Sequence, residues 1–346
     1  MTIVEATRSV VGGIDTHGEV HVAAALDEVG GLLGAESFSA DASGYEALVR
    51  WLEGFGSVAM VGVEGTGSYG AGISRFLARS GIVVIEVDRQ NRQARRRAGK
   101  SDPLDALEAA RAALSGKASG QAKSRDGWVE ALRVLLVAKR SARSARVKAL
   151  TQMRQVVYSA PEELRSAFKG LPISTFVAKA HGLRPSRAAD PVTAATKTSL
   201  SSLGHRVDDL KAEIERLDDM ITPLVRSGAP ELLAIRGVGI DTAATLLVAA
   251  GDNPKRLKSE AAWAHLCGVS PLEASSGKVT RHRMNPGGNR QANSALWHIV
   301  ITRLAKDPET QAYMERRVKE GLSKREVIRV LKRYVAREVY RSLPRR

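Results

Sequence analysis

Two stretches near the start of the chain, Ser9-Val-Val-Gly-Gly-Ile-Asp15 and Val58-Ala-Met-Val-Gly-Val-Glu64, decide the fold. Each is a short, nearly continuous apolar run that ends on a carboxylate, which is the pattern of a buried strand with an acid at its end. Between them, Gly18 and the pair Gly30-Gly31 are turn signals that separate two further strands, predicted over 20–26 and 32–38.

The rest of the first third predicts helices that alternate with strands. A helix is expected over 43–53, where Ser43 and Glu46 have the spacing of a capping box. A second helix over 69–80 and a strand over 82–87 follow. Three antiparallel strands and then βα units form the order expected of a ribonuclease-H-like, RuvC-like α/β domain.

The remaining two thirds are predicted to be mainly helical. Apolar residues at helical spacing predict amphipathic helices over 128–157 and 208–222, the second ending at Pro223, which can pair as a coiled-coil hairpin. The segment 168–200 between them has no assignable pattern. After Pro230, an apolar helix over 241–250 and a basic helix over 325–341 are predicted. We therefore divide the chain into 8–118, 119–228 and 229–346.

The charge of the chain indicates a polyanionic partner. Lys and Arg number 53 against 37 Asp and Glu, which gives a formal net charge of +16. The cations cluster, with six and no acid between Arg89 and Lys100. The single cysteine, Cys267, excludes an internal disulfide and a multi-cysteine zinc site. No apolar run reaches the roughly 18 residues of a membrane span, so a soluble, cytoplasmic, nucleoid-associated protein is expected.

Four carboxylates form the first candidate site. Asp15 and Glu64 end predicted strands, and Asp102 and Asp105 lie three residues apart at a predicted helix start, with Pro103 between them. Clustered carboxylates repel one another unless cations bind, and hard oxygen ligands favour Mg²⁺ or Mn²⁺. Taken singly, Asp102 is better explained as a helix cap, and Asp15 and Glu64 as turn or ion-pair residues. His17 is interpreted as a turn residue, with a metal or phosphate contact as the lesser alternative.

Two further motifs lie in the last third. Ile235-Arg-Gly-Val-Gly-Ile240 precedes an apolar helix and resembles a phosphate-contacting helix-hairpin-helix turn, or is a simple helix cap. The loop Ser275-Ser-Gly277 offers an unhindered hydroxyl among arginines, although most loops of this kind are only surface turns. The cations expected to contact nucleic acid are Arg95, Arg96, Arg97, Lys100, Lys278, Arg281, Arg283, Arg290, Lys332 and Arg333.

Taken in order, these motifs resemble the insertion-sequence one-ten transposases, which are related to the Piv DNA invertase and are also called bridge-RNA recombinases. The resemblance rests on Gly13-Ile-Asp15-Thr-His, Val63-Glu64-Gly-Thr-Gly-Ser-Tyr-Gly70, Gly99-Lys-Ser-Asp102-Pro-Leu-Asp105-Ala, Ile235-Arg-Gly-Val-Gly-Ile240 and Ser275-Ser276-Gly277. It covers nearly the whole chain.

The resemblance implies a RuvC-like DEDD domain, a coiled-coil segment and a C-terminal transposase domain with a catalytic serine. Its metal-binding acids map onto Asp15, Glu64, Asp102 and Asp105. Its serine maps onto Ser276, which directly precedes glycine, with Ser275 as the alternative. The implied partners are donor and target DNA, a structured non-coding guide RNA, and further copies of the chain in a dimer or tetramer.

Two other functions remain open from the sequence. One is a RuvC-type endonuclease that hydrolyses DNA with the carboxylates alone. The other is a basic nucleic-acid-binding protein, without catalysis, whose acids are structural.

Overall fold

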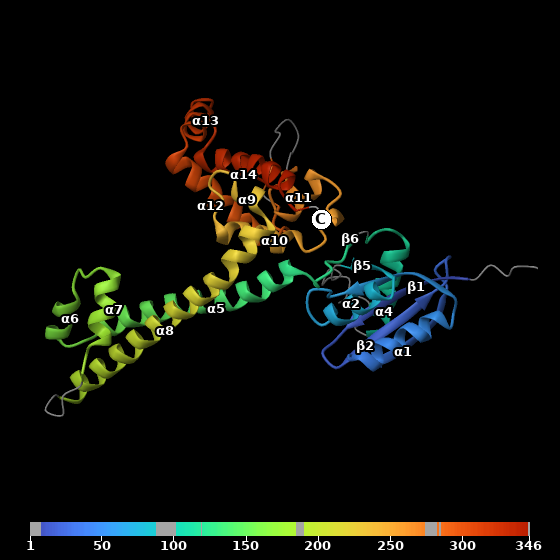
Figure 1. Ribbon diagram of the computed structural model, residues 1–346, viewed down its shortest axis with the longest axis horizontal. Coiled ribbons are helices and arrows are strands. Elements are labelled where there is room, and N and C mark those ends of the chain that lie inside the picture. Colours follow the sequence, from blue (N-terminus) through green and yellow to red (C-terminus); the bar gives the residue numbers. More distant parts are fainter. Residues whose placement is uncertain are drawn as a thin grey trace, which may run out of the picture. The chain divides into compact units, whose positions relative to one another are not determined.

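The computed structural model describes residues 8–87, 102–118, 120–184, 190–273, 282–283 and 285–344. The chain divides into two compact units, drawn as ribbons in Figure 1. The first contains the N-terminal residues up to Gly127 together with Ala250–Ala262, and the second contains Trp128–Ala249 and Trp263–Pro344.

A six-stranded mixed sheet forms the centre of the first unit. Its order is β3-β2-β1-β4-β5-β6, with β1–β2, β2–β3 and β5–β6 antiparallel, and β1–β4 and β4–β5 parallel. The predicted sequence of three antiparallel strands followed by βα units is therefore present. The strands are β1 (Ser9–Thr16), β2 (Val20–Leu26), β3 (Leu32–Ser39), β4 (Ser57–Glu64), β5 (Val83–Val87) and β6 (Gly120–Gln121).

Helices cover both faces of this sheet. On one face, α1 (Ala42–Glu53) and α2 (Ala71–Arg79) bury leucines and isoleucines against β1, β2 and β4. On the other face, α4 (Asp102–Leu114) packs its alanines against β1 and β2. Because both faces are covered, the central strands are apolar on both sides, which explains their continuous hydrophobic runs.

The predicted capping box at Ser43 is wrong. Helix α1 is capped by Asp41, whose carboxylate accepts the Gly44 N–H at 2.9 Å and the hydroxyl of Ser43 at 2.7 Å. These donors, the Gly44 N–H first, lower the pKa of Asp41. A carboxylate two residues earlier therefore takes the capping role, and Ser43 donates to it.

Helix α4 approaches the sheet through glycines. A Cβ atom added to Gly13 on β1 would lie 2.2 Å from the Ala106 carbonyl oxygen and 2.3 Å from the Ala110 nitrogen. At Gly62 on β4, an added Cβ would lie 2.4 Å from the Ala109 carbonyl oxygen. The helix backbone therefore rests directly on two neighbouring strands, and this contact sets the position of its first turn.

We expect Gly13→Ala to lower the free energy of unfolding of the first unit by about 1–3 kcal/mol or more, because the obstructing atoms belong to the helix backbone. Thermal unfolding followed by calorimetry measures the change. Gly120→Ala is the matched control, since a Cβ there would meet nothing within 4 Å. Equal stability of the two variants would contradict the described packing.

The first unit is completed by a segment from late in the chain. The side chain of Asn253 accepts the Ser124 N–H at 3.2 Å and donates to the Ala122 carbonyl at 2.9 Å. Arg256 lies in the same segment, and its burial, opposed by the charge of Glu86 on β5, lowers the pKa of its guanidinium. Residues 250–262 thus belong structurally with the N-terminal sheet.

Two long helices, α5 (Trp128–Tyr158) and α8 (Pro191–Gly228), lie side by side in the second unit (Figure 1). They run antiparallel, since Lys139 early in α5 contacts Asp218 late in α8. The C-terminal end of α5 and the N-terminal part of α8 share an apolar core with the short helices α6 (Glu162–Phe168) and α7 (Ile173–His181).

The predicted end of a helix at Pro223 is wrong. Helix α8 continues to Gly228, because Ile221 and Val225 on either side of the proline are fully buried and hold the helix in place. The same helix begins much earlier than predicted. Asp190 accepts the N–H groups of Val192 and Thr193 as an N-cap, and Pro191 occupies the first turn.

A buried lysine joins three helices of the second unit. The Lys139 side chain is 2% exposed, and its ammonium contacts the carboxylates of Asp218 and Asp241. Arg143 also contacts Asp241, at 2.7 Å. Burial raises the pKa of Asp241, but the hydrogen bonds from Lys139 and Arg143 outweigh it and lower the pKa overall. The cluster connects α5 and α8 to α10 (Ile240–Ala250).

The remainder of the chain is mostly helical, as predicted. None of the described helices has both the length and the apolar character of a bilayer span. Cys267 is buried, and burial raises the pKa of its thiol.

The other elements are α9 (Pro230–Leu233), the 3₁₀ turn η1 (Pro254–Arg256), α11 (Glu260–Leu266), β7 (Leu272–Glu273), β8 (His282–Arg283), α12 (Arg290–Lys306), α13 (Pro308–Lys319) and α14 (Lys324–Arg341).

Candidate metal centre

Two of the predicted acids meet at the same edge of the sheet. Strands β1 and β4 are adjacent and parallel, with Ile14 opposite Val63, so Asp15 and Glu64 follow side by side. Both side chains are buried, although they lie where the two strands end. A buried carboxylate requires a compensating charge or hydrogen-bond donors, so this edge is suited to a cation.

The loop after β4 holds the two strand ends together. The hydroxyl of Thr16 donates to the Glu64 carbonyl at 2.8 Å. Gly65 then turns the chain with a φ of +75°, a left-handed backbone conformation that residues with a side chain rarely adopt. A Cβ at Gly65 would lie 3.0 Å from the Thr16 hydroxyl, so glycine also allows this close approach.

The other two predicted acids lie at the start of helix α4, and Asp102 approaches the edge through His17. Asp102 and Asp105 both lie in the first turn of this helix and are half-buried. Their position follows from the contacts of Gly13 and Gly62 with the same helix. The positive end of the helix dipole also favours carboxylates there.

His17 completes a group of possible metal ligands. Its Nε2 atom lies 3.1 Å from a carboxylate oxygen of Asp15 and 3.7 Å from one of Asp102. One ligand atom from each of these three residues lies within 4.8 Å of the others. Two carboxylates and an imidazole at this spacing fit a divalent cation. Among the described residues, this group does not include Glu64 or Asp105.

For His17, the sequence favoured a turn residue over a metal contact. The turn is present, because the His17 N–H donates to the Val20 carbonyl at 3.2 Å. The available signal was the position of the imidazole two residues after a strand-end aspartate. In an extended chain, residues two apart lie on the same face of the sheet.

Four of the cations predicted to contact nucleic acid lie among the described residues, and Arg283, Arg290 and Arg333 are at least partly accessible. Arg283 on β8 and Arg290 at the start of α12 are exposed, and Arg333 on α14 is half-buried. The predicted residues outside the described part of the chain are Arg95, Arg96, Arg97, Lys100, Ser275, Ser276, Lys278 and Arg281.

Lys332 occupies a different environment from the other predicted cations. It is buried on the inner face of α14, and its ammonium donates to the side chain of Asn293 at 2.8 Å. Asn293 in turn donates to the Cys267 and Gly268 carbonyls at 2.9 Å and 3.0 Å. Burial lowers the pKa of Lys332. These contacts give the side chain a role in packing within the second unit.

Comparisons with known proteins agree on one family. A family model for transposases of the IS110 DEDD type matches residues 12–160, and a model described as the transposase IS116/IS110/IS902 family matches residues 229–315. A Streptomyces coelicolor protein, named the insertion element IS110 uncharacterized 43.6 kDa protein, is 32% identical over 133 residues. That match covers 38% of this chain and 31% of the relative, so the chain spans about a third of that relative's length.

Proposed function

Because the chain belongs to the IS116/IS110/IS902 family of transposases, we propose that it is a DNA transposase that cuts and rejoins strands at the sheet edge formed by Asp15, Glu64, Asp102 and Asp105. The observation that carries the proposal is the group of Asp15, His17 and Asp102, whose ligand atoms lie within 4.8 Å of one another. The chemistry supplied there by a bound Mg²⁺ or Mn²⁺ is neutralisation of the charge on the phosphate under attack.

The residues of the chain divide the work in this proposal. Asp15, buried at the strand end and 3.1 Å from His17, fixes the position of the metal site relative to the sheet. Asp102 and Asp105 close it from the first turn of α4, and Glu64 borders it from β4. The net charge of +16 attracts the DNA backbone, so binding weakens as salt increases.

The strand-transfer chemistry is assigned to Ser276. Its hydroxyl oxygen attacks phosphorus, the bond from phosphorus to a deoxyribose oxygen breaks, and the leaving oxygen takes up a proton. A hydroxyl of the partner strand then attacks the phosphoserine, forms the new phosphodiester and releases the serine. The number of phosphodiester bonds is conserved, so no external energy source is needed.

The proposed organisation and partners follow the family. A RuvC-like DEDD domain over 8–118, a coiled-coil segment over 119–228 and a transposase domain over 229–346, with a helix-hairpin-helix-like turn at 235–240, act on donor and target DNA. A structured non-coding RNA guides the complex, which is a homodimer or homotetramer. The mixed sheet and the basic charge support this assignment.

The direct test is strand exchange between paired donor and target DNA in the presence of the RNA encoded beside the gene. We expect products with Mg²⁺ or Mn²⁺ and none with excess chelator, and restoration when the ion is returned. Products that form equally with chelator would exclude a metal-dependent transposase.

His17 gives a prediction on metal preference. Imidazole nitrogen binds Mn²⁺ more readily than Mg²⁺, which prefers oxygen and retains its water. We therefore expect His17→Ala to weaken Mn²⁺ binding by about tenfold and Mg²⁺ binding by roughly threefold or less. Isothermal titration of each ion into the protein measures both constants.

The matched control for this titration is Glu19→Gln, which removes an exposed carboxylate two residues further along the chain. It should leave both binding constants unchanged. An equal loss for Mn²⁺ and Mg²⁺ in His17→Ala, or no loss of either, would exclude His17 as a ligand.

A further inference from the structure

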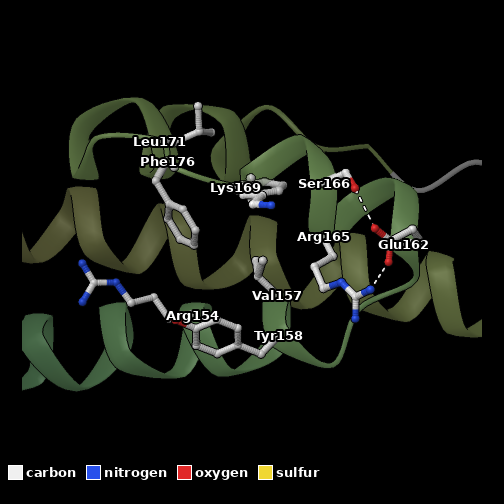
Figure 2. A pocket seen from close by; sticks show the side chains of 11 residues that line it. Arg154, Val157, Tyr158, Glu162, Arg165, Ser166, Lys169, Leu171 and Phe176 are labelled. Carbon is white, nitrogen blue, oxygen red and sulfur yellow. Dashed lines mark hydrogen bonds and ion pairs between the residues drawn. The ribbon is translucent and has the colours of Figure 1, made fainter.

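A pocket of about 510 Å³ lies at the closed end of the α5–α8 hairpin, far along the sequence from the metal centre. Figure 2 shows it between the last turns of α5 and the segment that contains α6 and the turn into α7. Its size lies in the range of small-molecule and nucleotide sites. The lining residues are Arg154, Val157, Tyr158, Glu162, Arg165, Ser166, Phe168, Lys169, Gly170, Leu171 and Phe176.

The inner wall of the pocket is apolar. Val157, Phe168 and Phe176 are buried, and the two phenylalanine rings pack edge to face with centroids 5.0 Å apart. At the mouth, the residue Tyr158 is 75% exposed. A flat aromatic surface beside an apolar wall suits a planar, partly apolar group such as a nucleic-acid base.

The rim of the pocket is basic. Glu162 is engaged by Arg165 and accepts the Ser166 hydroxyl at 2.8 Å, so its charge is already compensated. Arg154 and Lys169 are exposed and have no acidic partner among the described residues. The mouth therefore presents uncompensated positive charge next to the aromatic ring, which favours a ligand with a phosphate.

From this combination we infer that the pocket binds one unstacked nucleotide of a single-stranded nucleic acid. The base stacks on Tyr158 at the mouth and enters along the apolar wall, and the adjoining phosphates contact Arg154 and Lys169. An acidic peptide would satisfy the cations but would leave the apolar wall unused. A base in a duplex is already stacked on both faces and paired along one edge, so duplex DNA cannot place a base in the pocket.

The inference rests on the proposed function in one respect, which is that the partner of the protein is a nucleic acid. It does not depend on cleavage, because every lining residue belongs to the second unit and none to the metal centre. Asp15→Asn is therefore expected to bind single strands as the unaltered protein does. Loss of strand exchange in that variant with intact single-strand binding would separate the two proposals.

Fluorescence anisotropy with labelled single-stranded RNA, single-stranded DNA and duplex DNA tests the pocket. We expect Tyr158→Ala to weaken binding of single strands by about tenfold or more, as for other stacking aromatics, and to leave duplex binding unchanged. A preference for RNA would indicate a guide-RNA loop as the source of the nucleotide, and a preference for DNA would indicate a separated target strand. Both tyrosine and cation changes are at exposed positions, and thermal unfolding verifies that the variants fold.

The charge contribution is tested by the double variant Arg154→Gln/Lys169→Gln. We expect the slope of log K against log salt to fall by on the order of 1.4 for single strands, because two phosphate contacts are lost. Lys148→Gln, an exposed cation on α5 outside the pocket, should change neither the affinity of the pocket nor this slope by a comparable amount. Unchanged single-strand binding in both pocket variants, or competition by an acidic peptide as strong as by single-stranded RNA, would overturn the inference.

Discussion

Asp15→Asn should abolish metal-dependent strand exchange, with a loss of about a thousandfold or more in rate. Asparagine has nearly the same shape but lacks the negative charge that holds a divalent ion, so the sheet edge keeps its structure and loses its ligand. The loss should be this large because Asp15 is the buried member of the group and lies 3.1 Å from His17. Strand exchange with labelled DNA measures the rate, and titration of Mn²⁺ measures the loss of ion binding.

Glu36→Gln is the matched control for Asp15→Asn, because Glu36 is an exposed carboxylate on β3 of the same sheet. It should retain full activity and ion binding. If Asp15→Asn keeps more than a tenth of the activity while folding normally, the sheet edge is not the catalytic centre. The non-catalytic nucleic-acid-binding function would then be the better assignment.

Ser276→Ala should remove the covalent protein–DNA product and reduce strand exchange by about a thousandfold or more, because loss of a nucleophile leaves only binding and electrostatic assistance. The covalent product resists denaturation, so gel electrophoresis of labelled DNA after denaturation measures it. Cleavage that continues without Ser276 but requires Asp15 would indicate the RuvC-type endonuclease.

Ser275→Ala is the matched control for this prediction, since it removes a hydroxyl from the neighbouring position of the same loop. We expect it to keep the covalent product. If Ser275→Ala loses the product and Ser276→Ala retains it, the nucleophile is Ser275 and the reaction stays as proposed. Retention of the product in both variants would exclude a serine nucleophile in this loop.

The sheet could be predicted from the sequence because its strands carry strong local signals. Strand β2 over 20–26 matches its predicted bounds, since a turn glycine precedes it and both faces of the sheet are covered. Helix α8 was harder to predict. Its first half buries the small residue Gly204 along with Leu200 and Val207, so the apolar stripe is thin there. The Asp190-Pro191 pair was the signal that could have located its start.

The candidate site could be predicted only in part. Acids at strand ends converge because parallel neighbours end at the same edge, and this rule brings Asp15 and Glu64 together. That His17 belongs to the group of possible metal ligands depends on its distances to Asp15 and Asp102. A position in a turn does not predict these distances. Lys332 shows the opposite case. Its basic neighbours on α14 predicted a DNA-binding surface. In the structure, Lys332 lies along the helix between the buried residues Leu331 and Ala336, and its own side chain is buried as well.

The contact between Gly13 and helix α4 has a consequence for how the protein can change over generations. Most packing defects can be suppressed by a second substitution that trims a neighbouring side chain. Here the two nearest neighbours of an added methyl group are the Ala106 carbonyl oxygen and the Ala110 nitrogen, which are backbone atoms that no substitution removes. A selection for revertants of Gly13→Ala should therefore return glycine itself far more often than a compensating change on α4, and copies of the gene that lose this glycine have few routes back.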